Sequence, residues 1–231
     1  QALSAAVGEA SVQSGVRIIL LTAAGPAFSA GGNLGNLGDR LAAVAGPDGR
    51  DPIATGNRRY GEFLTQLVNV PQVTVACIQG AAMGGGAGLA CAVDIAIGSP
   101  EARFGFPEAA IGLVPGQILP FVVARLGLPA ARRLVLTGRR IDAAEAYRIG
   151  LLDYVADSRQ ALEELTRQVL ESIVATAPQA SACTKRMLGR LPLAPLQASG
   201  ALQGYLDEAA ELFARQMRSE AMEGVSAVRD K

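Results

Sequence analysis

Residues 80–91, G-A-A-M-G-G-G-A-G-L-A-C, are the stretch whose residue types best permit chemistry. They follow the apolar run 73–78, so a buried strand is expected to pass through a glycine turn into a helix N-terminus. Glycines allow unusual backbone angles and close approach, and the first turn of a helix offers free N–H groups at its positive end. Such a place can hold a developing oxyanion, although glycines after a strand also form simple tight turns.

A second glycine-rich turn, G-P-A-F-S-A-G-G-N-L at residues 25–34, follows the strand-like run 16–22. Neither turn resembles a nucleotide cradle. The chain lacks G-x-x-x-x-G-K-[ST], and the spacing within residues 80–91 does not give G-x-G-x-x-G. Nucleotide phosphate is therefore not the expected ligand of these loops.

The absence of histidine narrows the acid–base chemistry. Ser-His-Asp and Cys-His triads, histidine-containing metal sites and histidine proton transfer are all excluded. The catalyst must be a carboxylate, a tyrosine, a lysine or a cysteine, and Glu108 in F-G-F-P-E is a candidate. Its local sequence favours a solvated loop carboxylate over a desolvated acid with a raised pKa.

Composition restricts the partners and the compartment. Acidic and basic residues balance at 21 each with a pI near 6.6, so no overall field attracts nucleic acid or an anionic membrane. No apolar run approaches the ~20 residues of a membrane span. Three cysteines in apolar surroundings indicate reduced core thiols, which predicts a cytoplasmic protein without disulfides or metal sites.

The order of the elements predicts a layered α/β body with a helical C-terminal part, because strand–loop–helix units come first and helices last. Residues 35–58 are expected to form a mobile polar loop, either a lid over a site or surface decoration. The expected strands are residues 16–22, 73–78, 94–97 and 152–155. The expected helices are residues 3–14, 60–67, 116–126, 143–149, 159–176, 178–189 and about 199–218.

Several motifs together resemble the enoyl-CoA hydratase/isomerase (crotonase) family. These are A-F-S-A-G-G-N-L at 27–34, G-A-A-M-G-G-G-A-G-L-A at 80–90, F-G-F-P-E at 104–108, G-L-V-P at 112–115 and T-G-R-R-I-D-A-A-E-A at 137–146. The resemblance covers nearly the whole chain. The family usually has one more β-hairpin region before the position of Gln1, often a contributor to coenzyme A binding, which we expect to be missing here.

The resemblance implies a crotonase-type ββα spiral core at residues 1–190 and a C-terminal helical oligomerisation segment at residues 191–231. It further implies a homo-trimer or a dimer of trimers that binds an acyl-CoA thioester. Coenzyme A enters as part of that substrate, and no separate cofactor is expected. Lys185 could meet the coenzyme A phosphates or be a solvated charge on a helix face.

The family polarises the thioester carbonyl with two backbone N–H groups, which map to Ala30 and Gly85. Hydratases commonly use two glutamates. One maps to Glu108, which the resemblance makes the proton donor and acceptor, whereas the other position is Gly88 in this chain. The residues expected to contact substrate are Phe28, Gly31, Gly32, Leu34, Gly84, Gly88, Pro107 and Gly116.

Three functions follow from this pattern. The preferred one is hydration of a 2-enoyl-CoA by Glu108, with water also held by backbone near Gly116 or by a polar group of the substrate. Residues 115–128 are similar to hydratases of branched glutaconyl-type thioesters. The second is a 3-enoyl to 2-enoyl-CoA isomerase, which needs only one carboxylate. The third, a non-catalytic scaffold or RNA-binding relative, is disfavoured by Glu108 and by the scarcity of lysine.

Overall fold

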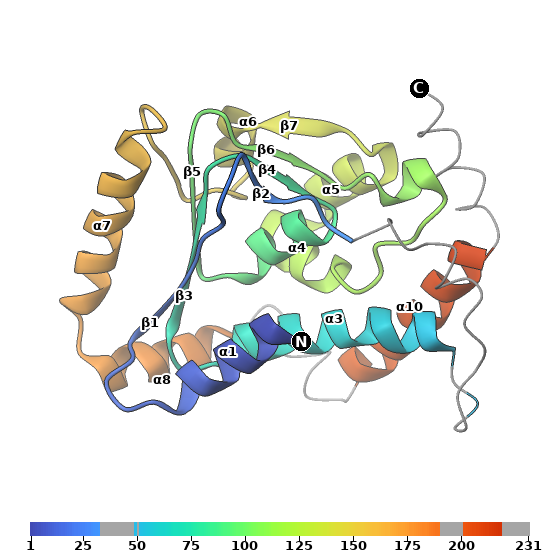
Figure 1. The fold of residues 1–231 in the computed structure, drawn as a ribbon, viewed down its shortest axis with the longest axis horizontal. Helices are drawn as coiled ribbons and strands as arrows, with labels where there is room; N and C mark the ends of the chain where they lie inside the picture. Colours follow the sequence, from blue (N-terminus) through green and yellow to red (C-terminus); the bar gives the residue numbers. More distant parts are fainter. Residues whose placement is uncertain (33–48, 50, 190–200, 219–231) are drawn as a thin grey trace.

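The chain folds into two four-stranded sheets flanked by helices. The computed structural model describes residues 1–32, 49, 51–189 and 201–218 (Figure 1). The first sheet has the parallel order β1-β3-β5-β8; the second has the order β2-β4-β6-β7, with only β6 and β7 antiparallel. The strands are β1 (Ile18–Leu21), β2 (Ala27–Ser29), β3 (Val73–Ile78), β4 (Ala81–Met83), β5 (Ile95–Gly98), β6 (Arg103–Gly105), β7 (Arg140–Asp142) and β8 (Tyr154–Val155).

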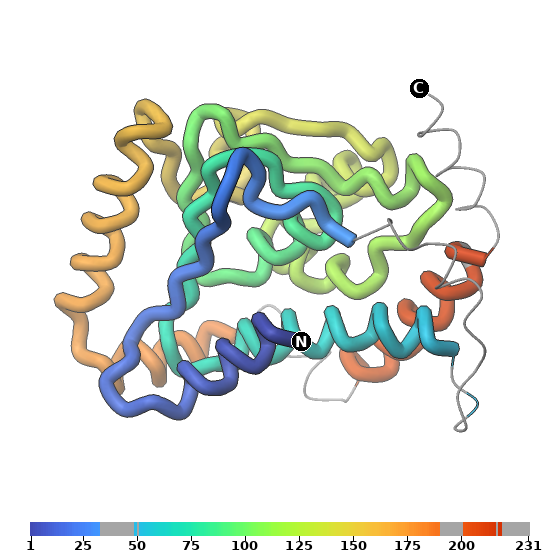
Figure 2. The backbone as a smooth tube through the Cα atoms, viewed as in Figure 1, coloured from blue at the N-terminus to red at the C-terminus, as the bar shows by residue number. Residues whose placement is uncertain are grey.

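From β1 to β6, consecutive strands alternate between the two sheets. The chain runs from β1 into β2, returns through a helix to β3 beside β1, and continues into β4 beside β2. The pair β5 and β6 repeats this step, so successive turns stack as a spiral that can be followed along the tube in Figure 2. This confirms the expected α/β core of ββα turns.

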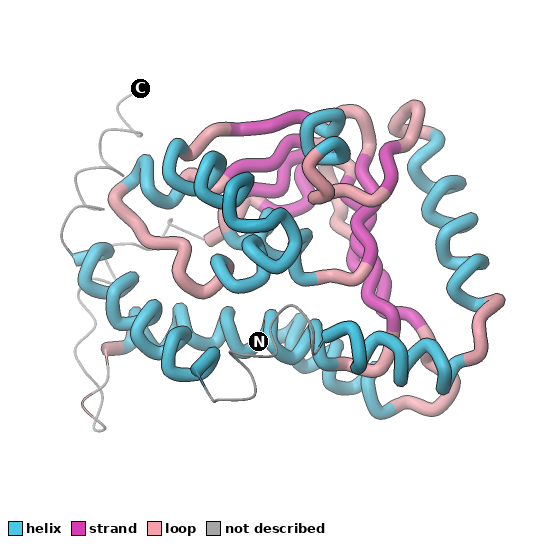
Figure 3. Tube along the Cα trace, turned by 180° about the vertical axis from the view of Figure 1, so that it is seen from behind, coloured by secondary structure: helices cyan, strands magenta, loops and turns pink. Residues whose placement is uncertain are grey.

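The helices complete the turns and cover the sheets. They are α1 (Ala2–Val12), α3 (Pro52–Asn69), α4 (Gly85–Ala92), the 3-10 helix η1 (Glu108–Ile111), α5 (Leu119–Thr137), α6 (Ala143–Arg148), α7 (Ala161–Val174), α8 (Pro178–Gly189) and α10 (Ala201–Arg218). Helix α5 bends at Gly127, whose φ of 71° and ψ of 159° are not helical. Seen from behind, α7 and α10 lie at opposite ends of the body (Figure 3).

Two apolar clusters explain this placement. Helix α7 packs Val169 and Ile173 against the first sheet through Val75 and Ile97. At the other end, α10 joins α3 in a separate cluster that includes Ile53, Leu113, Ala210, Ala214 and Met217. Burying such apolar side chains stabilises each contact by about 1.5–3 kcal/mol per large side chain. Helix α10 is therefore held against α3 within one chain, while its predicted role in oligomerisation stays a prediction.

The expectation of a polar loop over residues 35–58 is wrong for its last part. Residues 52–58 belong to helix α3, and residues 33–48 and 50 lie outside the described residues. The signal was present in the sequence. Asp51 caps the helix by accepting a hydrogen bond from the Ile53 N–H at 2.7 Å, and Pro52 occupies the first helical position, where its missing N–H costs nothing.

Candidate active site

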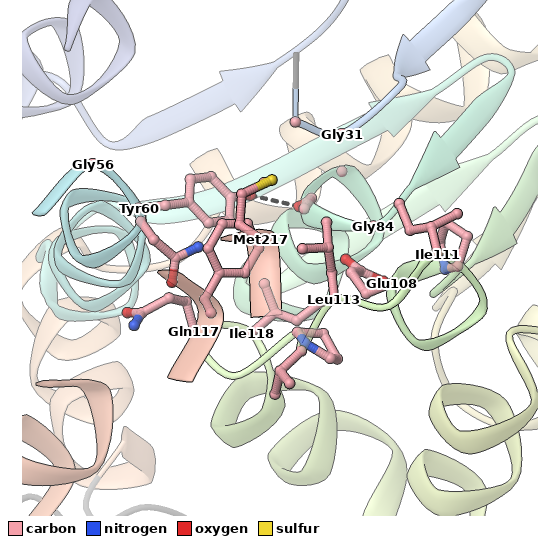
Figure 4. Close-up of a pocket in the computed structure, with 18 of the residues that line it drawn as sticks. Gly31, Gly56, Tyr60, Gly84, Glu108, Ile111, Leu113, Gln117, Ile118 and Met217 are labelled. Carbon is pink, nitrogen blue, oxygen red and sulfur yellow. Dashed lines mark hydrogen bonds between the residues drawn. The ribbon is translucent and has the colours of Figure 1, made fainter. Parts of the chain in front are cut away.

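A cavity of about 490 Å³ lies between the two glycine turns, η1 and the helices α3 and α10 (Figure 4). Most of its lining is apolar or backbone. The described lining residues are Ser29, Ala30, Gly31, Gly32, Pro52, Ile53, Gly56, Asn57, Tyr60, Gly84, Gly85, Gly86, Pro107, Glu108, Ile111, Leu113, Val114, Pro115, Gln117, Ile118, Phe213 and Met217. Glu108 is the one charged side chain in this set.

Glu108 is the first residue of η1, and Pro107 precedes it as the N-cap. Its Oε2 atom is buried and finds no hydrogen-bond partner in the described part of the chain. Burial raises the pKa of this carboxyl to about 7, because the charged form loses its hydration. Near neutral pH both protonation states are then available, as an acid–base catalyst requires. The solvated alternative that the local sequence favoured is wrong.

Gly84 places the backbone directly beside this carboxylate. Its φ of 54° and ψ of −119° strongly favour glycine, and a β-carbon built there would lie only 2.7 Å from Oε1 of Glu108. The Gly84 N–H donates to the Gly105 carbonyl at 2.8 Å, which fixes the turn to strand β6. Any side chain at this position would collide with the acid.

Gly85 begins helix α4, so its N–H has no acceptor within the helix. Its carbonyl is held by the Tyr60 hydroxyl, which donates to it at 2.5 Å. Burial, together with the nearby Glu108 charge, raises the pKa of Tyr60, so this phenol stays protonated and remains a donor. Tyr60 therefore positions the start of the helix and does not supply an acid near neutral pH.

The other glycine turn meets Gly85 from the opposite side. Gly31 has a φ of 88°, and a β-carbon built there would lie 2.7 Å from the Met83 carbonyl oxygen and 3.6 Å from the Gly85 nitrogen. Ala30, immediately before it, lines the same cavity. The structure thus brings Ala30, Gly85 and Glu108 together around one space, where an anion could form beside N–H groups and a carboxyl could exchange a proton.

Ile118 separates position 88 from this space. A β-carbon at Gly88 would lie 2.4 Å from Cγ2 of Ile118, and it is Ile118 that lines the cavity. The family's second glutamate would have no room here. The apolar side chain that replaces it leaves Glu108 as the one carboxylate of the described lining.

The remaining predicted substrate contacts divide into two groups. Gly31, Gly32, Gly84 and Pro107 line the cavity. Phe28 instead packs in the main core with 9% of its surface exposed, and Gly116 is covered by α10, where a β-carbon would lie 2.5 Å from Cβ of Ala209. The cavity is not lined by Phe28, Gly88 or Gly116 in this structure. Leu34 lies outside the described residues.

Sequence reasoning missed the wall made by α3 and α10. Asn57 and Tyr60 on α3, Gln117 before α5, and Phe213 and Met217 on α10 all face the cavity. The N-cap signal at Asp51 would have extended α3 and placed Asn57 and Tyr60 on one helical face. No local signal brings α10, which begins more than 130 residues after the end of α3, to the site.

The comparisons with known proteins agree with this geometry. The family model described as enoyl-CoA hydratase/isomerase matches residues 2–228. The chain is 36% identical over 191 residues to a putative enoyl-CoA hydratase of Thermus thermophilus, covering 81% of this chain and 72% of that protein. It is 32% identical over 186 residues to a short-chain-enoyl-CoA hydratase of Clostridium acetobutylicum, covering 80% and 68%.

A solved enoyl-CoA hydratase/isomerase from Marinobacter aquaeolei superposes with a TM-score of 0.78 at 40% identity, covering 99% of this chain and 85% of that one. None of the described helices has the length and apolar character needed to cross a membrane. With the spiral fold, the two glycine turns and a match over nearly all its length, the chain belongs to the enoyl-CoA hydratase/isomerase family.

Proposed function

We propose that the protein hydrates the double bond of a 2-enoyl-CoA thioester with Glu108 as its single acid–base group. The observation that carries this proposal is the buried Glu108 carboxyl beside the N-terminus of α4, with a pKa raised to about 7 and one oxygen that has no partner among the described residues. The hydratase names of relatives at 32–36% identity support it.

In the proposed reaction the thioester oxygen lies between the N–H groups of Ala30 and Gly85. Neutral Glu108 gives its proton to the α-carbon from one oxygen. The other oxygen accepts a proton from the water that attacks the β-carbon, so Glu108 ends in its starting state. The electrons pass through an enolate, and each N–H donor at its oxygen is worth about 3 kcal/mol of barrier.

A second candidate is isomerisation of a 3-enoyl-CoA to a 2-enoyl-CoA. The filling of position 88 by Ile118 favours it, because the described lining offers no second carboxylate to activate water. Ionised Glu108 would remove a proton from the α-carbon and return it to the γ-carbon. This reaction needs no water and leaves the mass of the substrate unchanged.

Product analysis by mass and NMR separates the candidates, using wild type and Glu108→Gln with straight, branched and glutaconyl-type enoyl-CoA thioesters. We expect a gain of one water in the wild type, and a loss of about 10²–10⁴-fold in rate in Glu108→Gln, which retains the shape of the side chain but cannot shuttle the proton. A shifted double bond without added water would establish the isomerase. Full activity of a folded Glu108→Gln would remove Glu108 from either mechanism.

The acyl group is expected to be uncharged. A glutaconyl-type substrate carries a second carboxylate, and the described lining has no lysine or arginine to receive it, while Glu108 adds a negative charge of its own when ionised. In the same panel of thioesters, preferred turnover of the glutaconyl member would contradict this expectation.

A further inference from the structure

Gln117 carries an unused hydrogen-bond acceptor at the wall of the cavity. The residue is only 3% exposed, and its Oε1 atom is buried without a partner among the described residues. The orientation of its amide is fixed, because Nε2 donates to the Leu206 carbonyl at 2.7 Å and only the nitrogen can do so. Oε1 is therefore an acceptor that the described residues leave unsatisfied, which is energetically unfavourable for a buried group.

The opposing helix is shaped around this oxygen. A β-carbon built at Gly61 of α3 would lie 1.9 Å from Oε1 of Gln117, so only glycine leaves room for it. One helical turn before Gly61, on the same face of α3, stands Asn57. Its Oδ1 atom is also buried and without a partner in the described chain, and Asn57 also lines the cavity.

This polar pair lies away from the reacting end of the cavity. In the view of Figure 4, Gln117 and Glu108 stand on opposite sides, with Ile118 and Leu113 between them. Ile53, Phe213 and Met217 supply further apolar wall. An acyl chain with its thioester at Ala30 and Gly85 would thus run along apolar side chains toward two amides.

The chemistry of the pair selects the group that it can bind. Gln117 offers an acceptor. The Oδ1 atom of Asn57 accepts no hydrogen bond from the described residues, so the Asn57 amide can turn to present its NH₂ group as a donor. A hydroxyl both donates and accepts, so it matches the pair. A carboxylate would face the fixed oxygen of Gln117, and an ammonium would lose its hydration without meeting a counter-charge.

We propose that Gln117 and Asn57 form a specificity site for a hydroxyl group carried by the acyl chain, at a distance from the thioester. The proposal deepens the proposed function and rests on it. The hydroxyl donates to Oε1 of Gln117 and accepts from Nδ2 of Asn57. A chain ending in a methyl group leaves both amides unpaired, and a site built for a hydroxyl discriminates against such an analogue.

Calorimetry with unreactive, saturated acyl-CoA thioesters tests this without requiring turnover. The ligands are pairs with equal numbers of heavy atoms, in which the terminal OH of one member is replaced by CH₃ in the other, over a series of chain lengths. We expect the hydroxyl member of at least one pair to bind about tenfold or more tightly, which corresponds to one good buried hydrogen bond.

Two variants attribute that preference to the amides. Gln117→Met and Asn57→Leu retain approximate size without the polar atoms, and each should reduce the ratio of dissociation constants toward one. Met217→Leu, which alters the wall without changing its polarity, should shift both members of a pair alike. If Gln117→Met does not fold because the Leu206 contact is lost, Asn57→Leu carries the test alone.

The outcomes separate this inference from the proposed function. Equal affinities at every chain length, or a preference that survives in Asn57→Leu, would overturn the hydroxyl site; equal affinities with normal turnover would mean that the amides hold water. A hydroxyl preference without turnover of any enoyl-CoA would retain the site and remove the hydratase. Failure of both members to bind would overturn the thioester site and the inference together.

Discussion

Two regions of this molecule differ in whether their polar groups have partners. Between β3, β5 and α8, the Asp94 carboxylate accepts hydrogen bonds from the Thr74 N–H at 2.7 Å and hydroxyl at 2.9 Å, and it pairs with Lys185 at 2.6 Å. Lys185 also donates to the Gln72 carbonyl at 2.8 Å. In the cavity, by contrast, oxygens of Glu108, Gln117 and Asn57 are buried without partners in the described chain.

This difference indicates which region is structural and which is poised for a ligand. Around the exposed Asp94 the charges are matched, and its pairing with the partly buried Lys185 fixes α8 against the first sheet. In the cavity, the unpaired oxygens raise the free energy of the empty state, which a substrate can lower by supplying the missing partners. Lys185 therefore acts in the packing of this chain, and the expectation of a solvated charge on a helix face is wrong, whereas contact with the coenzyme A phosphates stays a prediction.

Gly85→Pro tests the catalytic role of the cavity and has the largest expected effect. Proline is tolerated at the first position of a helix, yet it removes the N–H proposed to bind the thioester oxygen. We expect kcat to fall about 10²–10³-fold. Gly85→Ala is the matched control: it keeps the N–H, and its β-carbon would approach Tyr60 to 3.3 Å. Near-normal turnover in a folded Gly85→Pro, or equal losses in both variants, would contradict the role of the N–H.

The pH dependence of stability tests the burial of the Glu108 carboxyl in the cavity. The folded-state pKa of Glu108, about 7, is above the ordinary value of 4.5, so the native state binds a proton more tightly than the unfolded state. The contribution of Glu108 to the free energy of unfolding is then greatest below pH 4.5 and declines as the pH rises toward 7. Glu108→Gln removes this decline and should be the more stable protein above pH 7, by at most about 3 kcal/mol.

Urea unfolding of wild type and Glu108→Gln across this pH range measures the difference. We expect the gap between the two proteins to widen between pH 4.5 and 7 and to be constant above. A gap that is independent of pH would show that Glu108 ionises normally in the folded protein, and would weaken its assignment as a proton donor near neutral pH.

Lys185→Met tests the satisfied region, where the expected effect is smaller and falls on stability. The substitution removes the charge that pairs with Asp94, so the free energy of unfolding should fall by about 2 kcal/mol. Turnover per folded molecule should be unchanged. Arg186→Met, at the exposed neighbouring position, serves as the control and should stay within about 0.5 kcal/mol of wild type. Loss of turnover in folded Lys185→Met would contradict the structural role.

Local patterns predicted a layered α/β body and the two glycine turns, through apolar runs for the strands and glycine clusters directly after them. The ββα spiral followed from the resemblance of the motifs to the family. The four strands of the second sheet, β2, β4, β6 and β7, were missed because each has only three residues, too few for an alternating pattern that distinguishes a strand from a turn. The Glu108 environment could not be read locally, because its burial comes from η1 folding onto Gly84, a contact between distant residues. The same holds for Gln117, whose neighbours are Gly61 and Leu206.

The packing of Gly88 against Ile118 has an evolutionary consequence. A glutamate introduced at position 88 alone would collide with Ile118 and bury a second charge, whereas shortening Ile118 to alanine alone would open a void and cost about 2–5 kcal/mol. Either order of the two changes passes through a weakened intermediate. A lineage with this pair is thus separated from a two-glutamate active site by a valley in fitness, and new activities are more accessible through the opposite wall, at Asn57 and Gln117.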